Sequence, residues 1–327
     1  MVLLDLLILA AGFAALIKGA DLFVDGSASL ARVFRVPAMI IGLTIVAMGT
    51  SAPELAVSTL AAAEGANEIA VSNVVGSNLF NLLMVLGICA AVRAVPVEGT
   101  ALNRDFAAAL FPTIAVFLLT GGMKVFSGEL FGMGMDSAAG TVTRPLALGL
   151  LAAFAAYLWF LTREARRQRR KEEDSFGFKY SKRKCALLIA AGMAMIVGGG
   201  QAVVYGARRI AEALGMSETL IGLTVVSLGT SLPELVTSLV AIRKKETELA
   251  LGNVVGSNIF NLMMILGVSA AIRPVAVNAA SVWDMLILTA VTAVTWLFAR
   301  VGKRISRAEG AAMVLAYAAA MVFAVIR

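Results

Sequence analysis

Runs of about twenty apolar residues, separated by short polar connections, recur along the whole chain, and this pattern is typical of helices that cross a membrane. The pattern predicts ten such helices, over residues 2–31, 37–63, 68–92, 103–120, 145–163, 185–213, 217–242, 247–272, 281–300 and 307–326. Residues Gly121–Arg144, rich in Gly and Met, are predicted to form a longer loop. The predicted fold class is therefore an all-α membrane protein with ten transmembrane helices.

The basic stretch 163–184 is predicted to be a linker between two halves of five helices each, residues 1–162 and 185–327. Lys and Arg number 21 in the connections on the linker's side of the membrane and six on the other side. Cytoplasmic loops carry the excess of Lys and Arg, so the linker is predicted to be cytoplasmic and both termini extracytoplasmic, in a cell (inner) membrane. The basic run itself is interpreted as a solvated loop that fixes orientation, with contact to anionic lipid as the alternative.

Composition agrees with a membrane protein. The chain is 60% hydrophobic and 15% charged, with a mean hydropathy of +0.88, whereas an average globular chain is about 45–50% apolar and about 25% charged. The first helix begins with Asp5 rather than a basic region and is too long for a signal peptide. The net charge of +7 is a topology signal in such a protein, so the lipid bilayer, and not nucleic acid, is the predicted partner. The oligomeric state stays open.

An internal repeat links the two halves. Residues 42–91 and 222–271 align without a gap at an offset of 180, and 28 of the 50 positions are identical. The copies lie five predicted helices apart, and an odd number means that they enter the membrane in opposite directions. Inverted repeats are the plan of many secondary transporters, whose binding site lies near the bilayer midplane at the repeat interface.

Each repeat carries a polar cluster in the middle of an apolar helix: Gly49–Glu54 reads GTSAPE, and Gly229–Glu234 reads GTSLPE. The proline of each cluster lacks an N–H, so carbonyls one turn earlier lose their helix partner and become available as acceptors. Irregular backbone at this depth is tolerated only where it is buried in protein or lines a cavity. The hydroxyl groups of the two clusters belong to Thr50, Ser51, Thr230 and Ser231.

Glu54 and Glu234 add one carboxylate to each cluster, and a charge at the bilayer centre costs at least ~2.5 kcal/mol. Neither cluster contains Lys or Arg, so a bound cation is the predicted counter-charge. The facing helices add side-chain oxygens that lie four residues apart and therefore share a helix face. These residues are Ser77 with Asn81, and Ser257 with Asn261. Such an oxygen set suits hard cations such as Ca²⁺.

Other ligand chemistry is scarce in this chain. It has no histidine, and its two cysteines, Cys89 and Cys185, imply no disulfide framework, so soft metals are disfavoured and no cofactor is expected. A structural interpretation of the clusters stays possible, since proline often only kinks a membrane helix and Ser or Asn often joins helices. Duplication of both glutamates favours the ion site. Lys18, Asp21 and Asp25 in the first helix are assigned a structural role, as an intrahelical pair or a water-facing surface.

At these residues the sequence resembles the cation/Ca²⁺ exchanger superfamily and looks like its prokaryotic sodium/calcium exchanger branch. The resemblance rests on GTSAPE with GSNLFN and on GTSLPE with GSNIFN, and it extends to Lys18–Asp21 and Arg307–Gly310. It implies that Na⁺ and Ca²⁺ compete for one cluster and are exchanged by alternating access. The implied ligands are Glu54, Glu234, Thr50, Ser51, Thr230, Ser231, Ser77, Asn81, Ser257 and Asn261, with the backbone carbonyls of Ala47 and Ser227.

One position departs from the family pattern. Many relatives carry Asp where this chain has Asn261 or Asn81, so the formal charge of the site is −2, from the two glutamates alone. One Ca²⁺ or two Na⁺ neutralise that charge. The potassium-dependent branch relies on an Asp in the second repeat, so Asn261 argues against K⁺ coupling.

The predicted function is a secondary antiporter that exchanges Na⁺ for Ca²⁺, with both ions as transported substrates and no enzymatic activity. A Ca²⁺/H⁺ antiporter on the same fold is the first alternative. A cation channel and an intramembrane enzyme are the remaining alternatives. The enzyme is disfavoured because a symmetric, duplicated oxygen shell suits ion ligation better than an acid–base pair, whose pKa values must differ.

Overall fold

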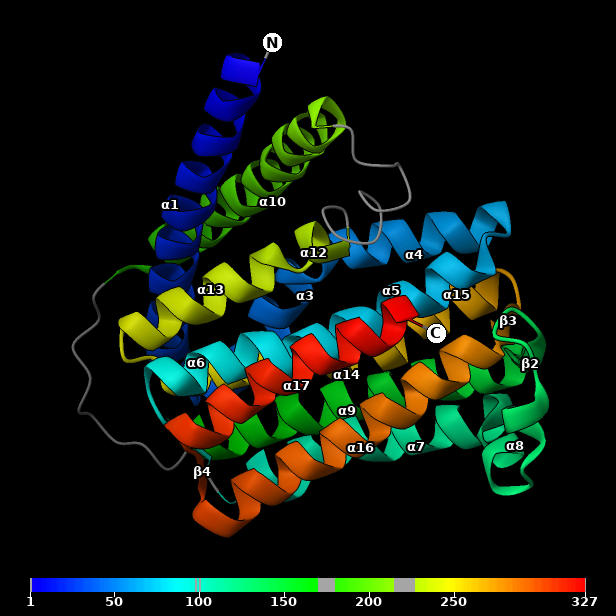
Figure 1. The fold of residues 1–327 in the computed structure, drawn as a ribbon. Coiled ribbons are helices and arrows are strands. Elements are labelled where there is room, and N and C mark those ends of the chain that lie inside the picture. The colour runs from blue at the N-terminus through cyan, green and yellow to red at the C-terminus, as the bar shows by residue number, and fades with distance from the viewer. Residues whose placement is uncertain (1, 98, 100, 170–179, 215–226, 327) are drawn as a thin grey trace. The chain divides into compact units, whose positions relative to one another are not determined.

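A computed structural model describes residues 2–97, 99, 101–169, 180–214 and 227–326 (Figure 1). The α-helices are α1 (Val2–Phe34), α2 (Ala38–Ile41), α3 (Ala47–Thr50), α4 (Ala52–Glu64), α5 (Asn67–Phe80), α6 (Gly87–Val92), α7 (Phe106–Phe117), α8 (Met123–Phe126), α9 (Arg144–Arg169), α10 (Lys182–Ala213), α12 (Ser227–Thr230), α13 (Leu232–Arg243), α14 (Thr247–Ile259), α15 (Leu266–Ile272), α16 (Ala279–Gly302) and α17 (Arg307–Ile326). Wider π-helical turns join several of them, namely η1 (Gly42–Val46), η2 (Asn81–Leu86), η3 (Ala101–Asp105), η4 (Leu118–Gly122) and η7 (Phe260–Ile265).

The apolar helices match the predicted spans. Within the described residues, eight helices are long and apolar enough to cross a membrane, and a bent pair, Ala38–Thr50 with Ala52–Glu64, makes a ninth. The predicted helix 217–242 lies partly outside the described residues, and its described part is α12 and α13. Helix α9 runs on to Arg169, so it includes the first seven residues of the stretch predicted as linker.

The predicted loop Gly121–Arg144 contains ordered elements that the sequence pattern did not indicate. They are α8, a short 3₁₀ turn (Glu129–Gly132) and strand β2 (Ala138–Val142). Strand β2 reads AAGTV and has little intrinsic β-propensity, so its pairing with strand β3 (Val275–Asn278), far away in sequence, is what makes it a strand.

The described chain forms two compact units. The first comprises Met1–Pro53 and Thr162–Val254, and the second comprises Glu54–Leu161 and Val255–Arg327. Each unit takes residues from both halves of the sequence. The division into halves and linker therefore stays a prediction from the repeat.

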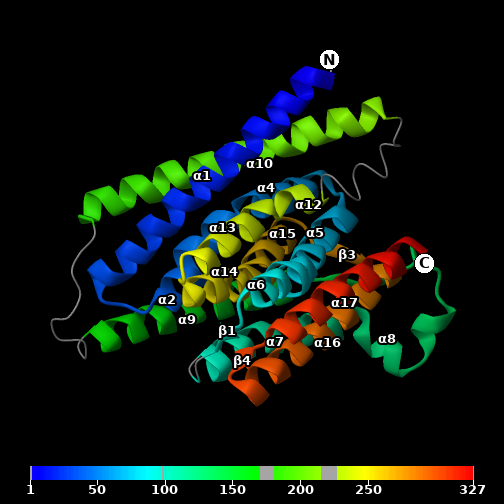
Figure 2. The same cartoon turned by 60° about the vertical axis from the view of Figure 1, so that its left-hand side comes forward.

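In the first unit, α1 and α10 lie side by side and run antiparallel (Figures 1 and 2). Glycines seven residues apart line the contact, Gly12 and Gly19 on α1 and Gly192 and Gly199 on α10. A Cβ added at Gly192 would lie 2.6 Å from the backbone nitrogen of Phe23. The two backbones are therefore in direct contact, which is how small residues drive helix association in lipid.

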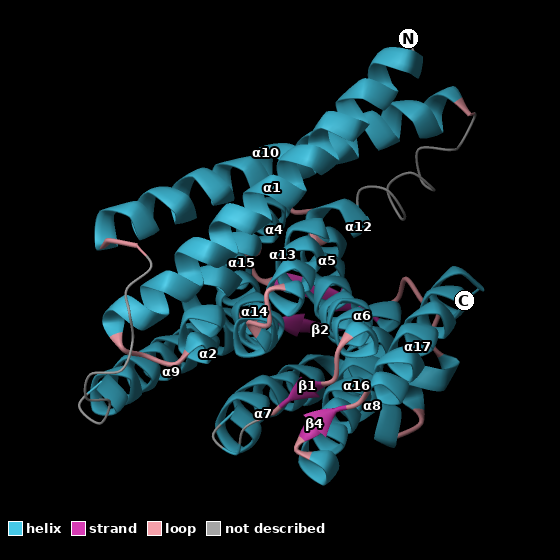
Figure 3. Ribbon diagram, turned by 90° about the vertical axis from the view of Figure 1, so that its left-hand side faces the viewer, coloured by secondary structure: helices cyan, strands magenta, loops and turns pink. Residues whose placement is uncertain are grey.

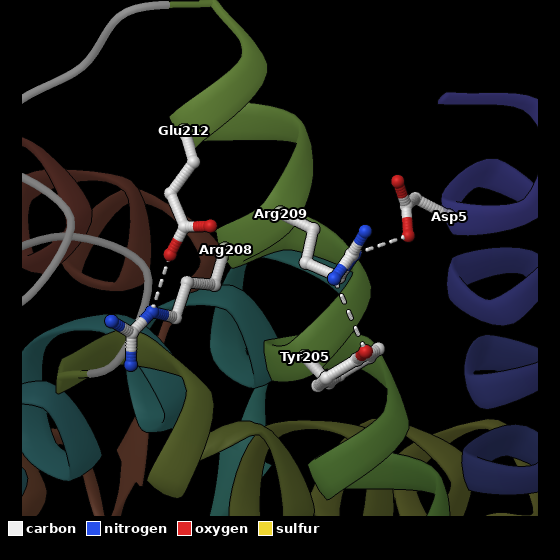
Figure 4. A network of polar contacts seen from close by, with 5 residues as sticks. All are labelled: Asp5, Tyr205, Arg208, Arg209 and Glu212. Carbon is white, nitrogen blue, oxygen red and sulfur yellow. Dashed lines mark hydrogen bonds and ion pairs between the residues drawn. The ribbon is translucent and has the colours of Figure 1, made fainter. Parts of the chain in front are cut away.

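An ion pair joins the same two helices near the start of α1 (Figure 4). The guanidinium of Arg209 donates to Asp5 over 2.7 Å, and it lies 5.7 Å above the ring of Tyr205. The Asp5 side chain is only 5% exposed, so its charge needs this partner. Arg208 pairs with Glu212 one turn away, at 2.7 Å, on the exposed side of α10.

Further along α1, charged residues join this helix to the turn between α13 and α14. The Lys244 Nζ lies 3.1 Å from Asp21 Oδ1 and 3.0 Å from Asp25 Oδ1, and Arg32 pairs with Glu246. Partial burial lowers the pKa of the Lys244 amine, but hydrogen bonds and charges from Asp25 and Asp21 raise it more, so its net pKa lies above the ordinary value. Asp21 and Asp25 thus form ion pairs with a residue far away in sequence, whereas the sequence suggested an intrahelical pair or a water-facing surface.

In the second unit, two short antiparallel sheets join connections from different halves of the sequence (Figure 3). Strand β1 (Val95–Pro96) pairs with β4 (Arg304–Ile305), and β2 pairs with β3. Strands β1 and β3 start at equivalent positions of the repeat, 180 residues apart, and β2 and β4 each precede the last helix of a half. The sheets are therefore counterparts of each other, and each joins one half to the other through backbone hydrogen bonds.

We expect Gly192→Ala to lower the thermal unfolding midpoint of the purified protein in detergent. The added methyl group meets backbone atoms that have no room to move, and overpacking of this kind costs about 1–3 kcal/mol. Gly198→Ala is the matched control, because no atom lies within 4 Å of a Cβ at this position of the same helix. That control should leave the midpoint unchanged or raise it, since Gly in a helix interior costs about 0.5–1 kcal/mol. Equal midpoints for the two variants would contradict the close backbone contact.

Candidate cation site

Both proline-containing clusters break a membrane helix at the same place. Ser51, between α3 and α4, has φ −86° and ψ 11°, and Ser231, between α12 and α13, has φ −93° and ψ 4°. The following proline, Pro53 or Pro233, then occupies the first turn of a new helix, where its missing N–H costs nothing. The span predicted over 37–63 therefore consists of two segments bent by 51°, and the irregular backbone predicted at the proline cluster lies at this bend.

The break places each glutamate in the first turn of a helix. Glu54 is the third residue of α4, and Glu234 is the third residue of α13. The N-terminal turn of a helix carries partial positive charge and unpaired N–H groups, which stabilise a carboxylate. Both side chains are fully buried, with 0% exposure.

Nearly all the other predicted ligands are buried as well. The structure buries Ala47, Thr50, Ser51, Ser231, Ser77, Asn81, Ser257 and Asn261. Thr230 is half-buried, which distinguishes it from its counterpart Thr50, exposed by 1%. Ser227 begins α12, and its side chain lies outside the described residues.

In the first unit, residues of both repeats hydrogen-bond around Glu234. The Ser51 hydroxyl donates to Glu234 Oε1 over 2.7 Å, and the Thr50 hydroxyl donates to Asn253 Oδ1 over 3.1 Å. Asn253 in turn donates from Nδ2 to the hydroxyl oxygen of Ser238, at 2.9 Å, and to the Glu234 carbonyl, at 3.5 Å. The hydroxyls of GTSAPE therefore contact the carboxylate and the facing asparagine of the second repeat.

In the second unit, the asparagine contacts are repeated beside Glu54. Asn73 Nδ2 donates to the Ser58 hydroxyl oxygen over 2.8 Å and to the Glu54 carbonyl over 3.2 Å. These three residues precede Asn253, Ser238 and Glu234 by 180 positions. In both repeats a facing asparagine thus holds the turn that carries the glutamate.

The two serines in these contacts, Ser58 and Ser238, were not among the predicted site residues. Their identity at equivalent positions of two apolar helices was the available signal. Asn73 and Asn253 belong to the repeated motif but had no assigned role, because a sequence pattern does not show which helix an asparagine faces.

A third set of contacts lies where the repeated GSN motifs meet in the second unit. Asn78 Nδ2 donates to the Asn258 carbonyl, and Asn258 Nδ2 donates to the Asn78 carbonyl, each over 3.2 Å. Asn261 Nδ2 donates to Asn78 Oδ1 over 3.1 Å. The pair of equivalent residues 78 and 258 therefore binds reciprocally, as expected at a pseudo-twofold axis.

Several buried oxygens close to these contacts accept no hydrogen bond from the described residues. They include Asn81 Oδ1, Asn261 Oδ1 and Ser257 Oγ, on side chains with 0% exposure. A buried polar group without a partner costs about 1–3 kcal/mol. These oxygens are the sequence-predicted ligands of the facing helices, and a hard cation would satisfy them. Both asparagines lie in π-helical turns, a feature that is frequent at functional sites.

The predicted Ala47 carbonyl ligand already serves the helix. It accepts the Ser51 N–H over 3.0 Å, and it lies 3.3 Å from the Thr50 hydroxyl oxygen, whose single proton it shares with Asn253 Oδ1. The carbonyl that Pro53 deprives of its usual helical donor is that of Gly49, four residues earlier. The assignment of Ala47 as a ligand stays a prediction.

Comparison with known proteins identifies the family. The model of the family described as sodium/calcium exchanger protein matches residues 4–163 and 184–326. The chain belongs to the sodium/calcium exchanger family. It is 36% identical to the putative antiporter CaxA of Alkalimonas amylolytica, with 94% of both chains covered. It is 32% identical to the sodium/calcium exchanger MaX1 of Methanosarcina acetivorans, over 98% of this chain and 99% of that one.

The fold agrees with solved exchanger structures. A structure of the sodium-calcium exchanger NCX_Mj soaked with Na⁺ and Ca²⁺ superposes with a TM-score of 0.82 at 29% identity, covering 98% of this chain and 99% of that one. The predicted fold class is confirmed: the protein is an all-α membrane protein whose ten transmembrane helices form two inverted five-helix repeats. It is a multi-pass cation/Ca²⁺ antiporter of this family.

Proposed function

We propose that this exchanger couples the movement of Na⁺ in one direction to the movement of Ca²⁺ in the other. The proposed ligands are Glu54, Glu234, Thr50, Ser51, Thr230, Ser231, Ser77, Asn81, Ser257 and Asn261, with the carbonyls of Ala47 and Ser227. The observation that carries the proposal is the duplicated cluster, in which a fully buried glutamate begins a half-helix and an asparagine of a facing helix holds its turn.

The charge of these clusters favours a cation as the ligand. Glu54 and Glu234 are fully buried, and a buried carboxylate is far more stable with a positive partner. The neutral oxygens around them come from hydroxyl and amide groups, which complete the shell of a hard cation. The two glutamates give a formal charge of −2, which one Ca²⁺ or two Na⁺ neutralise.

The hydrogen bond from Ser51 to Glu234 suggests how the ligands respond to ions. A hydroxyl has one proton and two lone pairs, so it can donate to the carboxylate and still offer a lone pair to a cation. Coupling requires that the inward-facing and outward-facing states bind the two ions with different free energies. Ligands from both repeats provide for this, because motion between the repeats changes the ligand set.

The protein is proposed to lie in the cell (inner) membrane. In this orientation both termini are extracytoplasmic and the basic linker 163–184 is cytoplasmic. Support comes from the excess of Lys and Arg, 21 against six, in the connections on the linker's side.

Calcium uptake into proteoliposomes tests the coupling. Vesicles loaded with Na⁺ and diluted into Na⁺-free medium should take up ⁴⁵Ca²⁺, whereas vesicles with Na⁺ on both sides should not. Uptake that instead requires an imposed pH gradient, with no response to Na⁺, would replace Na⁺ coupling by the H⁺-coupled alternative. Non-saturating flux without any counter-ion would indicate a channel.

Glu54→Gln and Glu234→Gln should each abolish exchange while the protein still inserts and purifies. Each substitution keeps the shape of the side chain but removes half of the negative charge that offsets the cation. Glu129→Gln is the matched control, because the Glu129 side chain is 57% exposed and pairs with Lys124 at the surface. Uptake should therefore fall to the level of empty vesicles in the first two variants and stay normal in the control. Substantial Na⁺-driven Ca²⁺ uptake by either site variant would remove that glutamate from the site.

A further inference from the structure

The reciprocal pair Asn78 and Asn258 is almost completely buried, with exposures of 2% and 4%. Neither residue belongs to the proposed ligand set. The amide NH₂ group of each side chain donates a hydrogen bond to the backbone carbonyl of the other residue, over 3.2 Å. The function of this pair is therefore open beyond joining the two repeats.

The orientation of the Asn78 amide follows from these contacts. Its Nδ2 donates to the Asn258 carbonyl, so its Oδ1 must lie on the opposite side of the amide plane. A reversed amide would bring two oxygens together at 3.2 Å. Asn78 therefore presents an acceptor to its next neighbour.

That neighbour is Asn261, which donates from Nδ2 to Asn78 Oδ1 over 3.1 Å. This contact orients the Asn261 amide in turn and leaves its Oδ1 as a fully buried acceptor that receives no hydrogen bond from the described residues. Ser257, one helical turn earlier on the same face, also has a buried Oγ without a partner there. The Ser257 and Asn261 side-chain oxygens thus lie on one face of the same helix of the second repeat.

We propose that Asn78 is a positioning residue, which orients the Asn261 amide so that its carbonyl oxygen, and not its NH₂ group, is presented to the transported cation. The inference rests on the proposed function, since it concerns one ligand of the proposed site. It also explains what position 261 requires, namely a donor toward Asn78 and an acceptor toward the ion on the same side chain. A primary amide meets both requirements at once.

We call the two contacts that run from Asn261 through Asn78 to the Asn258 carbonyl the relay. The repeat supplies an internal control, because the equivalent residues of the opposite copies do not form these two contacts within the described residues. Asn258 Oδ1 and both amide atoms of Asn81, the counterparts of Asn78 Oδ1 and Asn261, have no hydrogen-bond partner within the described part of the chain. Loss of either asparagine side chain, at 78 or at 258, removes one hydrogen bond to a backbone carbonyl. Only the loss at 78 also releases Asn261.

A double-mutant cycle tests the relay. The proteins are wild type, Asn78→Ala, Asn258→Ala, Asn261→Ala, and the two double variants that contain Asn261→Ala. The measurements are the half-saturating Ca²⁺ concentration of Na⁺-driven uptake and the Ca²⁺-induced rise in thermal midpoint. Asn78→Ala should raise the half-saturating concentration on the order of tenfold, the effect of losing one oriented ligand contact.

The decisive comparison is between the two double variants. In the Asn261→Ala background, Asn78→Ala should not raise the half-saturating Ca²⁺ concentration further, since the amide that Asn78 orients is already absent. Asn258→Ala should have a smaller effect alone, and in the double variant its fold-change should multiply that of Asn261→Ala. The midpoint without Ca²⁺ should fall similarly in Asn78→Ala and Asn258→Ala, which separates positioning from stability. Should Asn78→Ala not purify as a folded protein, Asn78→Leu, which fills the volume without polar atoms, takes its place in the cycle.

Multiplicative effects of Asn78→Ala and Asn261→Ala, or equal losses of Ca²⁺ affinity in Asn78→Ala and Asn258→Ala, would overturn the relay. Both outcomes leave Na⁺/Ca²⁺ exchange by the wild type intact, so they are distinguishable from a failure of the proposed function. If the wild type shows no Na⁺-driven uptake, the Ca²⁺-induced shift in midpoint still completes the cycle.

Discussion

Two carboxylates without a basic neighbour in their own motifs must be accommodated inside apolar helices, and much of this structure follows from that constraint. Glu54 and Glu234 are fully buried, and each lies in the first turn of a half-helix, where the partial positive charge stabilises a carboxylate. The helix break that creates this environment depends on the proline one residue earlier. The remaining charge is what a transported cation neutralises in the proposed mechanism, so the constraint on folding and the capacity for binding have one origin.

Because of the inverted repeat, the same local arrangement occurs twice, once around each glutamate. Asn73 and Asn253 hold the two glutamate-bearing turns through the same pair of hydrogen bonds, at 2.8 and 3.2 Å and at 2.9 and 3.5 Å. The two small sheets repeat this symmetry in the connections. The symmetry ends at the residues that contact the relay, since Asn261 binds Asn78 while Asn81 has no such bond within the described residues. In the proposed site, this difference would make the ligands from the two halves unequal.

Much of this could be predicted from the sequence, because the offset of 180 and the apolar runs are properties of the chain itself. The helices, their inverted relation and the buried glutamates follow from that pattern. The contacts between segments that are distant in sequence do not follow from it. The ion pairs of Lys244 with Asp21 and Asp25 join distant segments, and strand β2 exists only through its partner β3. The glycines of α1 and α10 were visible at intervals of seven, but which helix they contact depends on packing.

Equilibrium binding of ⁴⁵Ca²⁺ to the purified protein in detergent, repeated at increasing Na⁺, tests whether the buried glutamates of both repeats bind Na⁺ and Ca²⁺ in competition. We expect saturable Ca²⁺ binding that Na⁺ displaces completely and that disappears in the Glu54→Gln/Glu234→Gln double variant. Calcium binding that persists in the double variant, or that Na⁺ does not displace, would contradict competitive binding at these glutamates.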